Sequence, residues 1–149
     1  MTGYASAVVA IMPDGTFPMV KDYRKHPEDP RWKFPGGKSQ GNETAQECAA
    51  RELDEETGVK VDPEQLVAIH RERRRNRDDG GWHDLVVFQT TLPMLQEVKR
   101  TGNHGEHVAL WSSEDLLDPR SEMDVFAPHL SIAKNLVRFN DARALEAAE

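Results

Sequence analysis

The amino-acid sequence predicts an α/β fold with a mixed, partly antiparallel sheet lying between helices. Several short apolar segments have the length and composition of strands, and one segment near the middle has clear helix boundaries. These strands and helices do not alternate strictly, which disfavours an all-parallel sheet. Residues 128–147 carry apolar side chains near one helical face and predict a closing C-terminal helix. At 149 residues, the chain is long enough to bury a core, and we expect a single domain over residues 1–149.

The first elements are expected to form a hairpin followed by a short strand. Residues Tyr4–Met12 are rich in Ala, Val and Ile, as in a buried strand. The turn at residues 13–16 contains a glycine, whose permissive backbone suits a tight reversal. Residues 18–23 are then expected to return beside the first strand. A short strand at residues 31–34 should end at the Pro-Gly-Gly turn of residues 35–37.

Residues 44–57 show the clearest helix signal. Thr44 suits the N-cap position, and Glu47 three residues later completes a capping box. Gly58 stands where helices commonly end. After this helix the pattern predicts further strands and the start of a short helix: strands at residues 66–74, 82–92 and 107–111, and helical residues 113–116.

The composition is that of a soluble globular protein. A formal net charge of −7 disfavours long nucleic acid as a partner, because a polyanion needs many Lys and Arg residues to neutralise it. A small anionic substrate remains compatible, since a divalent metal can bring phosphate into an acidic pocket. No apolar run reaches the roughly 18–20 residues of a membrane span, and the N-terminus lacks the features of a signal peptide. Cys48 is the only cysteine, so no internal disulfide can form, and we expect a cytoplasmic protein.

Three glutamates of the predicted helix point to a metal site. Glu52, Glu55 and Glu56 are spaced i, i+3 and i+4, so they share one flank of the helix. Carboxylate oxygens at this density suit a hard cation such as Mg²⁺ or Mn²⁺, which would also relieve their mutual repulsion. Taken alone, an acidic helix is more often a solvated surface. The glycines at positions 36 and 37 favour the metal site, because they let the backbone approach a metal or phosphate closely.

The spacing of residues from this glycine turn to the end of the helix resembles the Nudix box at every defined position. The box occupies residues 37–59 and comprises Gly37, Glu43, Arg51-Glu52-Leu53, Glu55-Glu56 and Gly58-Val59. Nine positions at fixed spacing form a far more specific signal than a glycine-rich loop alone. The expected hairpin, the later strands and the closing helix also resemble the Nudix order of elements, more loosely.

The resemblance implies an α/β/α sandwich that hydrolyses a diphosphate bond with water. It implies that Glu52 and Glu56 are the principal ligands of Mg²⁺, with Mn²⁺ as an alternative cofactor. Glu55 would be a third ligand or a proton acceptor, and the Gly37 carbonyl oxygen would also face the metal. We expect the metal to polarise the phosphate and to lower the pKa of a bound water.

Two basic residues of the box receive supporting roles from the same resemblance. Arg51 would pair with Glu43 or orient Glu52. Lys38 would approach a substrate phosphate as a point charge. Arg51 is therefore a candidate for the catalytic machinery, and Lys38 for substrate binding.

Outside the box, Glu106 is the leading candidate for a base or an extra metal ligand, because many Nudix enzymes place such a group in a loop near this point. Glu97 is the alternative, and an exposed loop carboxylate is the plainer interpretation of either residue.

Trp32 and Phe34 lie on the same face of the predicted strand that leads into the box, where they could stack on a base. Core packing explains both rings equally well.

A basic run occupies the end of the strand predicted at residues 66–74 and the loop after it. Its members are Arg71, Arg73, Arg74, Arg75 and Arg77. One interpretation is a phosphate grip beside the site. We favour a solvated strand end for most of them, because alternation along a strand sends half of the side chains to the far face.

The box fixes the chemistry but leaves the choice of substrate to the loops. Residues Trp32–Lys38 look most like the nucleoside triphosphate hydrolases of the MutT type. Dinucleoside polyphosphates, ADP-ribose and nucleotide sugars are the alternative substrates, and a non-catalytic nucleotide-sensing module is the alternative class. The expected partner is therefore a small nucleotide, bound by a monomer or homodimer, with no long nucleic acid and no membrane.

Overall fold

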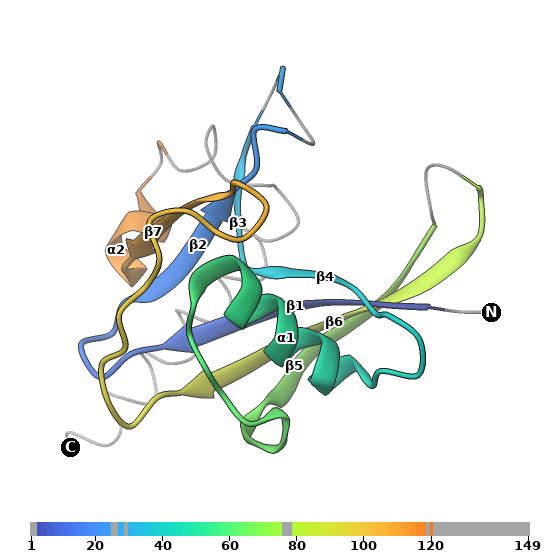
Figure 1. The fold of residues 1–149 in the computed structure, drawn as a ribbon, viewed down its shortest axis with the longest axis horizontal. Helices are drawn as coiled ribbons and strands as arrows, with labels where there is room; N and C mark the ends of the chain where they lie inside the picture. Colours follow the sequence, from blue (N-terminus) through green and yellow to red (C-terminus); the bar gives the residue numbers. More distant parts are fainter. Residues whose placement is uncertain (1–2, 25–26, 29, 76–78, 119, 121–149) are drawn as a thin grey trace.

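The computed structural model describes residues 3–24, 27–28, 30–75, 79–118 and 120. In chain order (Figure 1), its elements are β1 (Gly3–Ile11), β2 (Phe17–Lys21), β3 (Trp32–Lys33), β4 (Gly36–Lys38), α1 (Ala45–Thr57), the 3₁₀ turn η1 (Pro63–Gln65), β5 (Val67–Arg75), β6 (Trp82–Thr91), β7 (His107–Trp111) and α2 (Ser113–Leu117). The C-terminal helix predicted at residues 128–147 lies outside the described residues.

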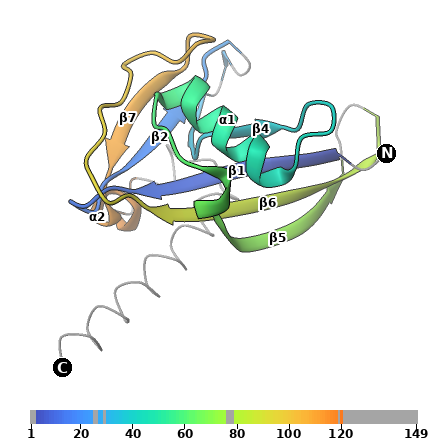
Figure 2. The same ribbon diagram turned by 60° about the horizontal axis from the view of Figure 1, so that its bottom comes forward.

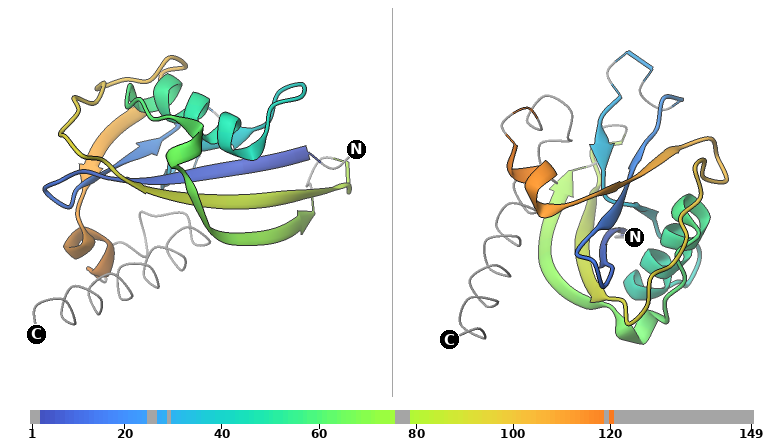
Figure 3. Two further views of the ribbon diagram at one scale, coloured as in Figure 1. Left: turned by 90° about the horizontal axis from the view of Figure 1, so that it is seen from below. Right: turned by 90° about the vertical axis from the view of Figure 1, so that its left-hand side faces the viewer.

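The strands form two sheets. The larger has the order β4-β1-β6-β5, and the smaller has the order β3-β2-β7. β1 and β6 run parallel, from Gly3 opposite His83 to Ile11 opposite Thr91, whereas the other pairings between described strands are antiparallel. The sheet is therefore mixed, as predicted. Figure 2 shows α1 lying against one side of the larger sheet, and Figure 3 shows the same layer from two further directions.

The predicted N-terminal hairpin is wrong in its pairing. A tight turn does join β1 to β2, and the Met12 N–H donates to the Thr16 carbonyl at 2.8 Å. However, β1 pairs with β4 and β6, while β2 pairs with β3 and β7 in the other sheet. Both strands are buried at consecutive positions, residues 6–10 and 17–20. A strand that is buried on both faces needs cover on both sides, which an isolated hairpin with one solvated face does not provide.

The glycine turn before α1 forms a strand, whereas the sequence suggested only a turn. Gly36 and Gly37 pair with Ala7 and Ser6 of β1. A side chain at position 36 would collide with the backbone carbonyl of Ser6, so this close approach requires glycine. The pairing fixes the start of the box against a central strand of the larger sheet.

Helix α1 begins and ends as the sequence predicts. The Thr44 hydroxyl accepts the Glu47 N–H at 3.1 Å, and the Glu47 carboxylate accepts the Thr44 N–H at 3.2 Å. Gly58 ends the helix with a φ of 82°, a left-handed conformation that favours glycine. Ala49 and Leu53 pack in the core between α1 and the larger sheet. This packing fixes the rotation of the helix and therefore the direction of its acidic flank.

Apolar residues cover both faces of the larger sheet. Val86 and Phe88 of β6 belong to the core beneath α1, whereas Leu85 and Val87 belong to the core on the other face, together with Phe34. Alternation along β6 thus sends neighbouring residues to opposite faces. Within the described ranges, no helix is long and apolar enough to cross a membrane.

Candidate active site

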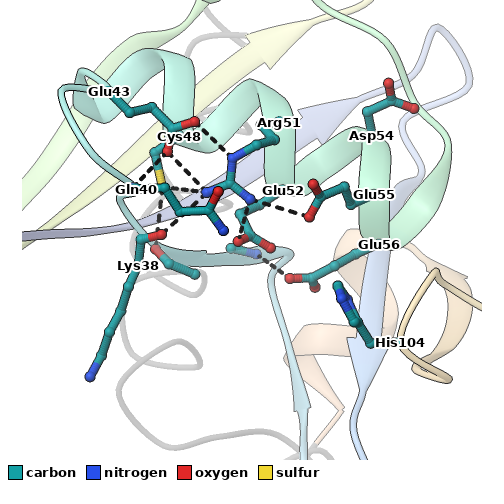
Figure 4. Close-up of polar contacts among 12 residues, drawn as sticks. Lys38, Gln40, Glu43, Cys48, Arg51, Glu52, Asp54, Glu55, Glu56 and His104 are labelled. Atoms are coloured by element: carbon teal, nitrogen blue, oxygen red, sulfur yellow. Dashed lines mark hydrogen bonds and ion pairs between the residues drawn. The ribbon is translucent and has the colours of Figure 1, made fainter.

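The three glutamates share one flank of α1, beside strand β4 (Figure 4). Glu52 and Glu55 are partly buried, whereas Glu56 is only 5% exposed. The Gly36 N–H donates to Glu56 Oε1 at 3.4 Å, which ties the strand to the helix. The helical spacing seen in the sequence thus places the carboxylates next to the glycine strand.

Arg51 holds several of these groups at once. Its Nε and Nη2 donate to the two carboxylate oxygens of Glu43 at 2.7 and 2.9 Å. Its Nη1 donates to Glu52 Oε1 at 2.9 Å and to Glu55 Oε2 at 3.2 Å, and Nη2 also reaches the Lys38 carbonyl at 3.2 Å. The Glu43 carboxylate, foremost, raises the pKa of Arg51, and the guanidinium lowers the pKa of Glu43. The geometry therefore contains both contacts expected of Arg51, with Glu43 and with Glu52.

Glu56 is the most deeply buried of the three glutamates. Its Oε2 is buried and has no hydrogen-bond partner among the described residues. Burial, foremost, and the neighbouring Glu52 carboxyl raise the pKa of Glu56, while the positive charge of Lys33 acts in the opposite direction. An ionised, buried oxygen without a donor is costly unless a cation approaches it. The Glu56 side chain is therefore suited to hold a divalent cation.

Gly37 lies where β4 and α1 come close together. An added Cβ would lie 2.6 Å from Glu52 Oε1, nearer than such atoms ordinarily approach. The Cys48 thiol donates to the Gly37 carbonyl at 3.5 Å and accepts from the Ser6 hydroxyl at 3.2 Å. Burial raises the pKa of the Cys48 thiol, which keeps it protonated. The Gly37 carbonyl is thereby held between the helix and β1.

The donor set suits a hard divalent cation. The candidate donors are the carboxylates of Glu52, Glu55 and Glu56 and the Gly37 carbonyl, all of them oxygen atoms of the kind that Mg²⁺ and Mn²⁺ prefer. In the part of the chain that the structure describes, no group of three or more His, Cys, Asp and Glu side chains is arranged so that it could hold a metal ion. Arg51 engages one oxygen each of Glu52 and Glu55. The partnerless Glu56 oxygen is thus the strongest indication of a cation site.

The loop before β7 distinguishes the two candidate bases. Glu106 is 5% exposed, and its negative charge contributes to the raised pKa of Glu56. The His104 N–H donates to Glu106 Oε2 at 3.2 Å. Glu97, the alternative, is exposed. Burial and proximity to Glu56 therefore favour Glu106.

The two aromatic rings considered for stacking have different surroundings. Trp32 is partly buried, and Lys21 Nζ lies 5.6 Å from the centroid of its ring. Phe34 is 1% exposed and packs in the core, with its ring centroid 6.0 Å from that of Phe17. The expectation that Phe34 contacts substrate is therefore corrected, because the ring is enclosed by apolar side chains. Trp32 remains a candidate, since part of its side chain reaches the surface.

The positions of two lysines relative to the glutamates differ from what the sequence predicts. Lys38 is exposed, and its ammonium group extends away from the glutamates in Figure 4, while its carbonyl accepts from Arg51. Lys33 of β3 instead acts electrostatically on Glu56. Lys33 was not among the residues predicted from the sequence, although strand alternation points to it: if the aromatic residues on either side face the core, Lys33 faces the other way. Of these two lysines, Lys33 is therefore the one whose charge lowers the pKa of the Glu56 carboxyl.

The family model for the NUDIX domain matches residues 1–131 of this chain. The chain therefore belongs to the Nudix hydrolase family, as the box predicts. A curated relative, nucleoside diphosphate-linked moiety X motif 6 of Mus musculus, is 46% identical over 62 residues, which are 42% of this chain. The match spans 20% of the length of that relative.

Solved structures show the same fold. The NUDIX domain of NrtR from Shewanella oneidensis, complexed with ADP-ribose, matches with a TM-score of 0.68 at 19% identity, over 90% of this chain and 85% of that one. The MutT protein of Methanosarcina mazei Go1 matches with a TM-score of 0.67 at 19% identity, over 93% of this chain and 95% of that one. At such low identity the likeness shows the fold alone.

Proposed function

We propose that this chain is a pyrophosphohydrolase that cleaves a diphosphate bond in a nucleoside diphosphate linked to a further group. The observation that carries the proposal is the buried oxygen of Glu56 without a hydrogen-bond partner, on the acidic flank of α1, because the ionised form of such a carboxylate is stabilised by a nearby cation. The favoured substrate is a nucleoside triphosphate, which would yield a nucleoside monophosphate and pyrophosphate. The favoured cofactor is Mg²⁺, with Mn²⁺ as a substitute.

The box residues divide the work of holding the cofactor. Glu52 and Glu56 would hold the cation together with the Gly37 carbonyl, and Glu55 would be a third ligand or a proton acceptor. When bound, Mg²⁺ would supply positive charge at the phosphate oxygens and lower the pKa of a water. Arg51 orients Glu52 and Glu55 through its guanidinium hydrogen bonds.

Residues outside the helix would act on the proton and on the substrate. Glu106 is the proposed general base, because it is a buried carboxylate near Glu56. A base of this kind contributes typically ~10²–10⁴-fold to the rate. Lys33 adds a positive charge beside Glu56 and is a better candidate than Lys38 for a phosphate contact. Trp32 is the proposed surface for stacking on the nucleobase.

The proposed substrate class has several alternatives. Dinucleoside polyphosphates, ADP-ribose and nucleotide sugars are the alternative substrates. The solved S. oneidensis domain is complexed with ADP-ribose. A non-catalytic sensing module is the alternative class, which the complete set of box carboxylates disfavours. A cytoplasmic monomer or homodimer stays a prediction from the sequence.

A product-release assay with Mg²⁺ tests the proposal. The panel contains canonical and oxidised nucleoside triphosphates, ADP-ribose, nucleotide sugars and dinucleoside polyphosphates, and the assay measures phosphate, pyrophosphate and nucleoside monophosphate. Wild type should cleave one class, and Glu56→Gln should lower kcat by at least about 10²-fold. Glu64→Gln, which changes an exposed carboxylate in η1, is the matched control and should keep wild-type kcat. Nucleotide binding without turnover of any class would contradict the enzyme and favour the sensing module.

A second pair of variants tests the base. Glu106→Gln should lower kcat about 10²-fold and change KM little, because the lost group acts on the proton and does not bind the substrate. Glu97→Gln should behave like wild type, since its side chain is exposed. The reverse ranking would assign the base to Glu97.

A further inference from the structure

The segment from Lys99 to Glu106, called the strap below, is fastened to the C-terminal end of α1. The Lys99 N–H donates to the Thr57 carbonyl at 2.8 Å, and the Asn103 N–H donates to the Glu55 carbonyl at 3.0 Å. Carbonyls in the last turn of a helix have no partners within the helix, so the strap supplies the missing donors. The loop that carries Glu106 is thus attached directly to the helix that carries the box glutamates.

Gly102 is the point where the strap meets the candidate site. An added Cβ at this position would collide with Glu106 Oε2 and would lie 2.7 Å from the Glu56 carbonyl oxygen. Gly102 is buried, and its N–H donates to the Glu106 carbonyl at 2.9 Å. The missing side chain therefore lets the Glu106 carboxylate lie close to the backbone of α1.

Lys99 fastens the strap through its side chain as well. Its Nζ donates to the Asp54 carbonyl at 3.4 Å and to Asn103 Oδ1 at 2.9 Å. Its methylene groups cover Gly58, where an added Cβ would lie 3.1 Å from Lys99 Cγ. One side chain thus joins the last turn of α1 to the middle of the strap.

We propose that Gly102 and Lys99 are positioning residues that hold the Glu106 carboxylate beside Glu56. The inference rests on the proposed function, in which Glu106 is the general base. The strap makes the base and the metal-binding helix one rigid unit, so their separation stays constant. A base that moves out of hydrogen-bond reach of the attacking water loses most of its effect on the rate.

A glycine outside the strap provides a matched control for Gly102. Gly15, in the turn between β1 and β2, has a φ of +85°, and an added Cβ there would point into open space. Gly15→Ala therefore strains a backbone turn that does not carry Glu106, whereas Gly102→Ala crowds the Glu106 carboxylate. With Mg²⁺ and the most rapidly cleaved nucleotide of the panel, Gly102→Ala should lower kcat about 10-fold or more and leave KM within about twofold. Gly15→Ala should keep kcat near wild type, and equal losses in the two variants would overturn the proposal.

The proposal also requires that the lower kcat of Gly102→Ala results from displacement of the Glu106 carboxylate. In the Glu106→Gln background, Gly102→Ala should lower kcat no further, because the base is already absent. A full additional loss would show general damage to the site and would reject the positioning role.

Lys99 gives a second route to the same conclusion if Gly102→Ala fails to fold. Lys99→Met keeps the aliphatic stem and removes the ammonium group, and it should lower kcat a few-fold. Lys99→Arg should keep most of the wild-type kcat, because its guanidinium can still donate to the Asp54 carbonyl and to Asn103 Oδ1. Wild-type kcat in Lys99→Met would overturn the role of the strap.

Amide hydrogen exchange separates the failure of this inference from the failure of the proposed function. The Lys99 and Asn103 amides should exchange faster in Gly102→Ala and Lys99→Met than in wild type, because their bonds to α1 open more often. Unchanged protection in an active enzyme would reject the inference alone. No turnover by wild type would reject the proposed function and this inference with it.

Discussion

Arginine occurs in two regions of this molecule with opposite surroundings. Arg51 on α1 is partly buried and donates to three carboxylates of the box. Arg71 and Arg73 are exposed on β5, which is an edge strand of the larger sheet. Charged side chains on an edge strand discourage unwanted pairing with other strands. One arginine surrounded by carboxylates therefore indicates a functional site more strongly than a run of arginines on an edge.

The arginines that follow in β5 are engaged within their own hairpin. Arg74 forms an ion pair with Glu72. The Arg75 guanidinium lies 5.7 Å from the ring centroid of Trp82, and its Nε donates to the Gly80 carbonyl at 3.2 Å. These contacts are typical of a solvated strand end and leave fewer basic groups available for a phosphate.

The largest effect is expected at Glu56, on the Arg51 side of the comparison. Because burial raises the pKa of Glu56 above the ordinary value of 4.5, the metal-free protein should lose stability as the pH rises above that value. Glu56→Gln should therefore stabilise the metal-free protein at neutral pH, by roughly 1–3 kcal/mol. Mg²⁺ should raise the Tm of wild type and leave that of the variant nearly unchanged. Thermal melts in EDTA and in Mg²⁺ measure both effects, and an equal Mg²⁺ shift in the two proteins would place the cation elsewhere.

The next effect is expected at Arg51 itself. Arg51→Lys keeps the charge but loses the planar fork that contacts Glu43 and Glu52 together. It should lower kcat about 10–100-fold, as changes in the groups that orient metal ligands do, and lower stability by roughly 1–3 kcal/mol. Arg73→Lys is the matched control on the exposed strand and should change neither quantity. Equal behaviour of the two variants in kcat assays and urea unfolding would remove the distinction between the regions.

A smaller effect is expected from the Glu43–Arg51 pair in acid. The hydrogen bond from Arg51 lowers the pKa of Glu43 below its ordinary value of 4.5. A lowered pKa contributes stability above the ordinary value, and that contribution is lost as the pH falls through the folded-state pKa. Wild type should therefore lose stability more steeply than Glu43→Gln as the pH falls below about 4.5. Urea unfolding across this range measures the difference, and parallel curves would mean that the pair adds nothing to stability.

The helix and its carboxylates could be predicted from the sequence because their signals are local. The capping box at Thr44, the stop at Gly58 and the i, i+3, i+4 spacing of the glutamates all lie within residues 44–58. The pairing of β1 and β2 depends instead on strands far along the chain, β6 and β7, so a tight turn between them gave the wrong partner. Local chemistry identifies an element, whereas its neighbours are decided by the packing of the whole domain.

The side chains around the site show the same limit at the level of single residues. Trp32 and Phe34 share one face of the chain, and the sequence alone does not say how deep each one lies. The structure buries Phe34 completely and leaves Trp32 at the margin. Gly102 belongs to no motif in the sequence, and its proposed positioning role rests on the contacts that an added Cβ would make with Glu106 and with the end of α1. Depth and proximity are tertiary properties, so the predicted list of site residues was incomplete.

The smallest effect is expected on the arginine-rich strand. Replacing Arg71 and Arg73 together by serine should leave kcat within about twofold and change the unfolding free energy by about 0.5 kcal/mol or less, because both side chains are exposed and neither is held by the box. The serine variant also shortens the side chains, so Arg71→Gln with Arg73→Gln provides a control that removes charge at similar length. KM measured at low and high salt is the sensitive readout. If these arginines contact a substrate phosphate in wild type, their removal should raise KM in both double variants and weaken the salt dependence of KM. Such a rise with unchanged kcat would show that the exposed arginines bind substrate after all, and the edge strand would then belong to the recognition surface of the enzyme.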